Sequence, residues 1–260
     1  QVTLPRMARH DRLDVFFGPS YSVPLALQTP RVVTLHDISF AIHPEWFSKR
    51  EGLRRRWLAY HAIGIAKFII TVSQFSRQEI IRYYDVDPKQ VSVVHNGIHR
   101  LSVPSSVEQS SLILYVGSLF NRRHLPTLIA AFAKIIRYVP DAKLAIVGSD
   151  RTYPRQNLAV LAKAAGVADR VMFRSYVSDD ILAALYAEAR VFAYLSEYEG
   201  FGMTPLEAIA AGVPIVVGDT PVAREVYGDA AHLVPVDNSN AVADALMLVL
   251  RDETTRSQMI

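Results

Sequence analysis

The sequence predicts an α/β protein with two doubly wound parallel-sheet domains, both Rossmann-like. The prediction depends on continuous apolar segments, on segments of about ten to fifteen residues with helical periodicity between them, and on the repetition of this alternation along 260 residues. Continuous apolar strands separated by helices are typical of a parallel sheet that is covered on both faces. A chain of this length can also form two domains, each with its own core.

The first domain shows a short version of this pattern. We expect helices over residues 48–67 and 76–84, and strands over residues 14–18, 31–36, 67–73 and 90–97. A doubly wound nucleotide-binding domain usually opens with a strand, a glycine-rich turn and a helix. No such unit precedes Asp14, so we expect this domain to be incomplete.

The second domain follows the pattern more fully. We expect strands over residues 112–117, 142–148, 171–177, 191–196, 214–218 and 232–236. Helices are expected over residues 125–139, 155–166, 179–189, 204–212 and 240–252. Gly166 ends the second of these helices, and no closing element follows the last.

A segment rich in serine, proline and glycine, residues 96–111, separates the two patterns. We therefore expect a first domain of residues 1–104 and a second domain of residues 105–260. Two such domains leave a cleft, and α/β sheets bind ligands beyond the carboxyl ends of their strands. The residues that directly follow the strands are therefore the candidate functional residues.

Composition limits the class of protein and its location. Half of the residues are hydrophobic and a fifth are charged, as in soluble globular proteins. The absence of cysteine excludes disulfides and thiolate metal sites, and it fits a reducing cytoplasm. No apolar run approaches the length of a membrane span, and the first residues do not resemble a signal peptide.

Positive charge concentrates in the first domain. Residues 1–104 contain 14 Lys and Arg against 8 Asp and Glu, whereas residues 105–260 contain 14 against 17. The excess lies in residues 49–56, which form either a solvated helix face or a patch for anionic lipid or an anionic acceptor. Nucleic acid is not an expected partner, because no recognition motif accompanies the charge and aromatic residues are not interleaved with it.

The most informative segment is SEYEGFGMTPLEAIAAG, residues 196–212. Thr204 suits the N-cap of a helix, with Pro205 as the first helical residue and Glu207 at the spacing of a capping box. Gly212 suits the left-handed position after the helix. Glu207 therefore has a structural interpretation beside a functional one, whereas Glu199 lies in the preceding loop and caps nothing obvious.

The two glycines between the glutamates, Gly200 and Gly202, allow the backbone to approach a ligand closely. The free N–H groups and the dipole of the following helix favour an anion. A carboxylate beside an anion site is favourable only where it accepts hydrogen bonds from neutral donors, such as sugar hydroxyls. A nucleotide diphosphate sugar has that layout, with phosphates in the middle and hydroxyls at both ends.

Two further strand ends carry candidates. Arg122 and Arg123 follow the first strand of the second domain and could clamp a diphosphate, although adjacent surface arginines are usually only solvated. His36 could hydrogen-bond a sugar hydroxyl or the attacking acceptor, although a lone histidine is more often structural. His95 is a weaker candidate of the same kind.

The pattern E-x7-E, from Glu199 to Glu207, resembles the signature of retaining glycosyltransferases of family 4, which have the GT-B fold. The resemblance extends over nearly the whole chain, through VVTLHDISFAIHPEWF, IITVSQFSRQEI, VVHNGI, LYVGSLFNRRHLPTLIAAF and VMFRSYVSDD.

The resemblance implies a role for each candidate. Glu199 and His36 would lie at the transferred sugar, and Glu207 would bind the ribose. The remaining residues would bind the donor diphosphate (Arg122, Arg123, Gly202, Met203 and Thr204) and the base (Tyr176 and Val177). Family members usually need no metal ion, so no cofactor is expected beside a UDP or GDP sugar as substrate, and many act at the cytoplasmic face of the membrane.

The chain also departs from the family. Arg123 stands where the family usually has lysine, His124 where asparagine often follows, and Ser175 where glycine is common. The glycine-rich loop that usually opens the first domain is absent, as is the C-terminal helix that returns to it.

The sequence thus predicts a retaining hexosyltransferase that moves a mannose- or glucose-type sugar to a saccharide or lipid-linked acceptor. One alternative is a non-catalytic module that binds nucleotide sugars or a membrane surface. A nucleotide-sugar epimerase is a further alternative, which the E-x7-E pattern does not support. Retention could arise by front-face attack, with the leaving phosphate as base, or through Glu199 as a nucleophile.

Overall fold

The computed structural model describes residues 3–98, 102–104, 107 and 109–259. The chain forms two compact units, of which unit 1 is Gln1–Asn96 with Glu199–Phe201 and unit 2 is Gly97–Tyr198 with Gly202–Ile260. The expected linker, residues 96–111, and the expected domain boundary at residue 105 lie partly outside the described residues.

Unit 1 contains a four-stranded parallel sheet in the order β1-β2-β3-β4. The strands are β1 (Phe16–Gly18), β2 (Arg31–Thr34), β3 (Phe68–Thr71) and β4 (Val91–Val93). The helices α2 (Ser39–Ile42) and α3 (Lys49–Ile65) connect β2 to β3, and α4 (Gln74–Tyr84) connects β3 to β4. The four strands and two helices that the sequence predicts over residues 14–97 are therefore confirmed.

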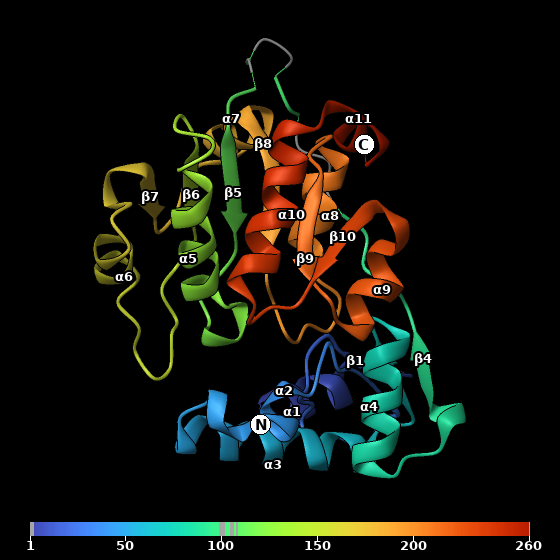
Figure 1. Cartoon of the computed structure of the whole chain (residues 1–260). Helices are drawn as coiled ribbons and strands as arrows, with labels where there is room; N and C mark the ends of the chain where they lie inside the picture. The colour runs from blue at the N-terminus through green and yellow to red at the C-terminus, as the bar shows by residue number, and fades with distance from the viewer. Residues whose placement is uncertain (1–2, 99–101, 105–106, 108, 260) are drawn as a thin grey trace. The chain divides into compact units, whose positions relative to one another are not determined.

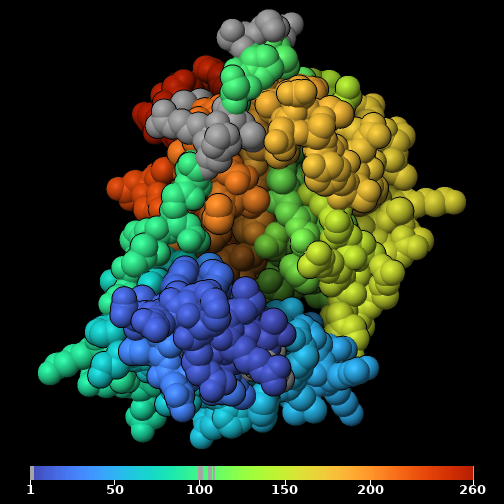
Figure 2. Space-filling view, turned by 180° about the vertical axis from the view of Figure 1, so that it is seen from behind, coloured from blue at the N-terminus to red at the C-terminus, as the bar shows by residue number. Residues whose placement is uncertain are grey.

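The helix α1 (Thr3–His10) was not expected from the sequence. Leu4, Pro5, Met7 and Ala8 lie on one side of this helix at helical spacing, but only Pro5 and Ala8 are buried. Its remaining residues are exposed, and they form part of the dark blue surface in Figure 2.

Unit 2 contains a six-stranded parallel sheet in the order β10-β9-β8-β5-β6-β7. Its strands are β5 (Leu112–Val116), β6 (Lys143–Val147), β7 (Val171–Arg174), β8 (Ala189–Tyr194), β9 (Ile215–Gly218) and β10 (Ala231–Val234). In the register of the sheet, Leu114 of β5 lies opposite Ala145 on one side and Phe192 on the other.

The direction of the chain reverses between β5 and β8, because it runs outward through β6 to β7 and then crosses back. Open α/β sheets bind ligands at such a switch point, outside the carboxyl ends of the strands. The loops that follow β5 and β8 are the ones that carry Arg122, Arg123 and the E-x7-E segment.

Seven helices accompany the described part of this sheet: α5 (Leu125–Ile135), α6 (Leu158–Ala164), α7 (Asp179–Glu188), α8 (Met203–Ala210), α9 (Pro221–Tyr227), α10 (Ser239–Arg251) and α11 (Glu253–Gln258). α5 and α10 pack side by side over one face of the sheet (Figure 1). The apolar core includes fully buried Tyr115, Phe132 and Phe192, and its removal from water is the main favourable contribution to folding. Of these helices, α9 and α11 were not expected, and α6 begins later than expected, because the Asn157 side chain caps it.

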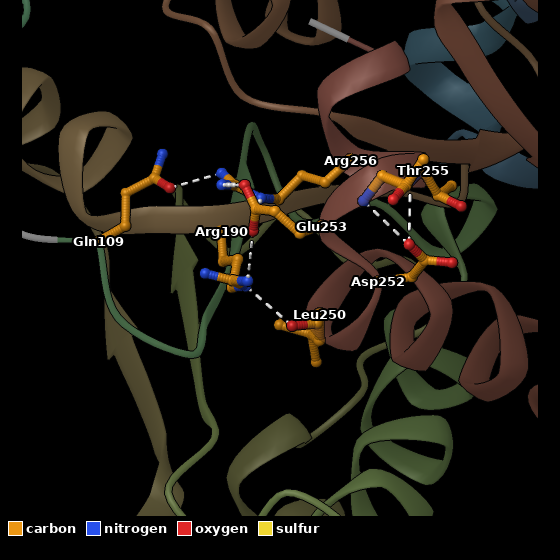
Figure 3. A network of polar contacts seen from close by, with 8 residues as sticks. Gln109, Arg190, Leu250, Asp252, Glu253, Thr255 and Arg256 are labelled. Atoms are coloured by element: carbon orange, nitrogen blue, oxygen red, sulfur yellow. Dashed lines mark hydrogen bonds and ion pairs between the residues drawn. The ribbon is translucent and has the colours of Figure 1, made fainter.

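A polar network attaches the C-terminal helix α11 to unit 2 (Figure 3). Arg190 of β8 donates to the Leu250 carbonyl oxygen at 2.8 Å and to Glu253 at 3.0 Å. Arg256 donates to the Gln109 side chain at 2.6 Å and also pairs with Glu253. Exposed ion pairs stabilise a fold little one by one, so we assign this network to positioning α11.

None of the helices in the described residues combines the length and the apolar character that crossing a bilayer requires.

Candidate functional site

The loops at the switch point of unit 2 are connected through their backbones. The Leu119 N–H donates to the Ser149 carbonyl oxygen at 2.9 Å, which joins the loops after β5 and β6. The Glu197 N–H donates to the Arg122 carbonyl oxygen at 2.9 Å, which joins the loops after β5 and β8. These bonds connect the loop that carries the two arginines to Ser149 and to Glu197, which lies two residues before Glu199.

Arg123 lies in this loop and is only 8 % exposed. Its Nη1 donates to the Tyr115 hydroxyl at 3.3 Å, and its guanidinium lies 4.8 Å from the centre of the Tyr194 ring. Planar stacking on aromatic rings suits guanidinium better than ammonium, which gives a physical reason for arginine at this position.

The neighbouring residues Arg122 and His124 are half-buried. The Arg122 guanidinium lies 4.1 Å from the centre of the Phe120 ring. His124 Nε2 lies 3.0 Å from Glu197 Oε2, and its backbone takes a left-handed conformation with φ 47° where α5 begins. Both side chains are therefore held by contacts with residues of the loops that follow β5 and β8.

The helix α8 does not begin as the capping pattern predicts. Its N-cap is Gly202, and Met203, Thr204 and Pro205 are its first three helical residues. Gly202 adopts a left-handed conformation with φ 84°, and the Tyr227 hydroxyl donates to its carbonyl oxygen at 2.9 Å. The predicted capping box is therefore wrong, because glycine reaches a conformation that allows the helix to begin two residues earlier.

This correction removes the structural interpretation of Glu207. The residue lies beyond the first helical positions, where it cannot reach back to an N-cap N–H as a capping-box glutamate does. The first-turn N–H groups of a helix have no intrahelical partners, and the Thr204 hydroxyl oxygen is buried without a hydrogen-bond partner in the described structure. The start of α8 thus offers donors to a ligand.

Glu207 lies half-buried beside Tyr186 of α7. Burial raises the pKa of the Glu207 carboxyl above its ordinary value, and the nearby Tyr186 hydroxyl opposes that shift only in part. Burial likewise raises the pKa of Tyr186, so its hydroxyl stays protonated. The Tyr186 hydroxyl lies beside the Glu207 carboxyl and can occupy only one of the acceptor sites of a carboxylate, so Glu207 can still accept from a ligand.

The other two candidates belong to unit 1. His36 follows β2 and is exposed, and its Nε2 lies 3.1 Å from the Pro19 carbonyl oxygen. A carbonyl oxygen only accepts, so this contact assigns the proton to Nε2 and leaves Nδ1 of a neutral ring as an acceptor.

The segment Glu199–Phe201 is part of the same unit as His36. The Gly200 carbonyl oxygen accepts hydrogen bonds from the Ser73 hydroxyl at 2.7 Å and the Ser76 hydroxyl at 3.3 Å. A Cβ at Gly200 would lie 2.1 Å from the His36 carbonyl oxygen, so no other residue fits there without displacing the backbone. The structure thus brings the backbone that follows Glu199 and that of His36 together, and sequence reasoning did not anticipate the hydrogen bonds from Ser73 and Ser76, which depend on this tertiary contact.

His95 also lies in unit 1, with its ring 5.5 Å from that of Phe201. His95 therefore lies beside the segment Glu199–Phe201.

Tyr176 and Val177 follow β7 in unit 2, where Tyr176 is 82 % exposed and Val177 is half-buried. The residues directly before them help to line a cavity of about 780 Å³. Its lining includes Gly148, Asp150, Arg155, Phe173, Arg174 and Ser175. Its size is that of a small-molecule site. Sequence reasoning missed this cavity, because it depends on the conformation of residues 149–157 and no periodic pattern marks that loop.

Within the described residues, His, Asp and Glu side chains do not gather in threes as a metal site would require.

Comparisons with known proteins support the predicted resemblance. The profile described as glycosyl transferases group 1 matches residues 102–260, and the profile of glycosyltransferase family 4 matches residues 1–100. The chain is 28 % identical to O-antigen chain mannosyltransferase B of Escherichia coli, over 93 % of this chain and 66 % of that protein. It is 31 % identical to the MMP alpha-(1->4)-mannosyltransferase of Mycolicibacterium hassiacum, over 84 % of this chain and 56 % of that protein.

Solved structures confirm the GT-B fold. WaaG, a glycosyltransferase involved in lipopolysaccharide biosynthesis, matches with a TM-score of 0.77 at 22 % identity, over 98 % of this chain and 74 % of WaaG. HepE of Anabaena, solved with UDP and glucose, matches with a TM-score of 0.79 at 22 % identity, over 99 % and 73 %. The chain spans about two thirds or less of the curated relatives named above.

Proposed function

Because the chain belongs to the group 1 glycosyl transferases, we propose that it transfers a hexose of the mannose or glucose type, with retention, from a UDP or GDP sugar. The acceptor in this proposal is a saccharide or a lipid-linked saccharide. The observation that carries the proposal is the half-buried Glu207, which has no capping role and lies on a helix whose glycine-capped start offers donors to an anion.

In this proposal unit 2 binds the nucleotide. The N–H groups of Met203 and Thr204 and the Thr204 hydroxyl bind the diphosphate, together with Gly202 and the two arginines Arg122 and Arg123. Glu207 accepts hydrogen bonds from the ribose hydroxyls. Tyr176 and Val177 contact the base, and the adjoining cavity leaves room for it.

The chemistry then requires one exchange of bonds at the anomeric carbon. The acceptor oxygen forms a bond to that carbon, the bond to the diphosphate oxygen breaks, and the acceptor proton passes to the leaving phosphate. Arginine guanidinium groups stabilise the charge that develops on that phosphate. Glu199 and His36, both in unit 1, bind hydroxyls of the transferred sugar and of the acceptor.

Retention also follows if Glu199 acts as a nucleophile, with two inversions. Its carboxylate forms a bond to the anomeric carbon as the bond to the diphosphate oxygen breaks, and the acceptor oxygen then displaces the carboxylate while the acceptor proton passes to the released diphosphate. A glycosylated Glu199 found by mass spectrometry after rapid quenching would favour this route. Its absence under turnover would favour front-face attack.

Calorimetry and a turnover assay on the same chain test the proposal. We expect UDP or GDP sugars to bind, and we expect a hexose to appear on a saccharide acceptor, with or without EDTA. Binding without turnover would favour a non-catalytic module, and a changed sugar in the absence of any acceptor would favour an epimerase. Activity that EDTA abolishes and Mg²⁺ restores would contradict metal independence.

A further inference from the structure

One face of α3 is apolar, aromatic and basic, yet it is exposed. Leu53, Trp57 and Tyr60 are 61 %, 54 % and 66 % exposed, although side chains of this kind are usually buried. Their spacing of three to four residues places them on one side of the helix. The opposite side, with Gly52, Ala59, Ala62 and Ile63, packs into unit 1.

Basic side chains share the exposed face. Lys49, Arg50 and Arg54 are exposed, and Arg50 and Arg54 fall in the same helical rows as Leu53 and Trp57. The nearby acidic residue Glu51 is already paired with Arg54 and Arg55, at 2.9 and 2.7 Å. We call Lys49, Arg50, Leu53, Arg54, Trp57 and Tyr60 the α3 face, and its net charge is positive.

We propose that the α3 face binds the surface of an anionic phospholipid bilayer. Tryptophan and tyrosine favour the boundary between headgroups and acyl chains, because their rings are apolar and their N–H and O–H groups remain hydrated. Lysine and arginine beside them attract anionic headgroups and keep their charge in the aqueous layer. The helix lies along the membrane plane in this arrangement, as interfacial helices do.

Charge distinguishes this partner from a second protein chain. A second copy of this chain paired through the α3 face would bring Lys49, Arg50 and Arg54 against the same cations of the other copy, and such like-charge contacts are unfavourable, whereas an anionic bilayer neutralises them. The proposal is independent of sugar transfer, since it requires neither the donor nor the acceptor.

Flotation with lipid vesicles tests the proposal without any substrate. The chain should bind vesicles of equal parts phosphatidylglycerol and phosphatidylcholine more than about tenfold more tightly than vesicles of phosphatidylcholine alone. Added sodium chloride should weaken that binding. Arg50→Glu should weaken it by about tenfold, and so should Leu53→Ser with Trp57→Ser, which changes only exposed side chains.

Matched variants in unit 2 test whether vesicle binding depends on the α3 face or only on exposed charge and apolar surface in general. Lys163→Glu and the pair Val160→Ser with Leu161→Ser change exposed residues of α6, and they should leave vesicle binding unchanged. Trp46→Phe leaves Trp57 as the single tryptophan, whose fluorescence brominated lipids should quench. The proposal is overturned if anionic vesicles do not bind, if the α3 variants bind as well as the original chain, or if these variants instead abolish a dimer seen by sedimentation.

Discussion

At the residue scale, the two glutamates of the E-x7-E pattern have different surroundings. Glu199 lies in unit 1, beside Gly200, whose carbonyl oxygen Ser73 and Ser76 hold. Glu207 lies in unit 2, on α8 beside Tyr186, where burial raises the pKa of its carboxyl. In the proposed function the two carboxylates bind different parts of the donor, so their variants should have separable effects.

Glu207→Gln should weaken UDP or GDP binding by about 10- to 100-fold, because a hydrogen bond to a charged group contributes about 1.5–3 kcal/mol. Calorimetry at neutral pH measures this loss. Asp244→Asn, a change at an exposed carboxylate of α10, serves as the control and should bind as the original chain does. Unchanged affinity in Glu207→Gln would contradict the ribose role.

The raised pKa of Glu207 predicts how binding depends on pH. Ribose hydroxyls favour the carboxylate form, so nucleotide affinity should rise as the pH rises through the raised pKa, which lies above the ordinary 4.5, and level off beyond it. Glu207→Gln should lack this part of the dependence. The nucleotide's own phosphate also titrates, but equally for both proteins, so the difference between their calorimetric profiles isolates Glu207.

The raised pKa of Glu207 also affects the stability of the fold, and it does so in the opposite direction from its effect on binding. An acid whose pKa is raised in the folded state destabilises that state once it ionises, so this contribution is absent below pH 4.5 and grows as the pH rises through the folded pKa. Glu207→Gln should therefore gain stability over the original chain toward neutral pH in denaturant unfolding. A stability difference that does not vary with pH would contradict the assigned shift.

At the scale of elements, the start of α8 depends on one glycine. A Cβ at Gly202 would lie 2.0 Å from the Tyr227 hydroxyl, and its backbone has φ 84°. Gly166 also has a positive φ, 73°, but nothing lies within 4 Å of its Cβ position. Comparing substitutions at Gly166 and Gly202 therefore separates the cost of backbone strain from the cost of displacing Tyr227.

Gly166→Ala should cost about 1–2 kcal/mol of stability from backbone strain alone. Gly202→Ala should cost more, because Tyr227 must also move, and it should weaken nucleotide binding, which Gly166→Ala should not. Denaturant unfolding and calorimetry on both variants measure the two effects. Equal losses of stability and equal affinities would show that the Tyr227 contact does not constrain α8.

Sequence patterns predicted the strands well because the strands lie in short, mostly apolar runs, as 112–117 and 214–218 illustrate. They failed at the start of α8, where Thr204, Pro205 and Glu207 satisfy a local capping rule. A glycine conformation and a tyrosine 25 residues away decide that start instead. The helix α11 was missed because it buries none of its residues and carries no apolar face for a periodic pattern to reveal. The helices α1 and α9 were also missed, and length alone does not explain this, because α6 and α8 are as short and were predicted.

The neighbours of the candidate site residues could not be predicted from the sequence either. Family resemblance locates Arg122, Arg123 and Glu207, but it does not reveal that Arg123 packs on Tyr194 or that Tyr186 lies beside Glu207. These neighbours come from other strands and helices, and only the folded chain brings them together.

At the scale of the whole molecule, the proposed roles divide between the two units. The candidates for the diphosphate, ribose and base all belong to unit 2, whereas His36 and Glu199 belong to unit 1. UDP or GDP alone should therefore protect amides of unit 2 from hydrogen exchange, over residues 117–124, 175–177 and 202–208.

Hydrogen exchange read by mass spectrometry measures this protection peptide by peptide. Peptides of α6 and α11 should exchange at the same rate with and without the nucleotide. Protection confined to unit 1, or to the groove between α5 and α10, would place the nucleotide elsewhere and contradict the proposed binding residues.

The most direct test of sugar transfer is NMR of the product formed from an α-linked UDP or GDP hexose and a saccharide acceptor. We predict a new α-glycosidic linkage on the acceptor, formed together with free nucleoside diphosphate. A β-linkage would contradict retention, and the absence of any new linkage from a screened set of donors and acceptors that the chain binds would contradict transfer itself.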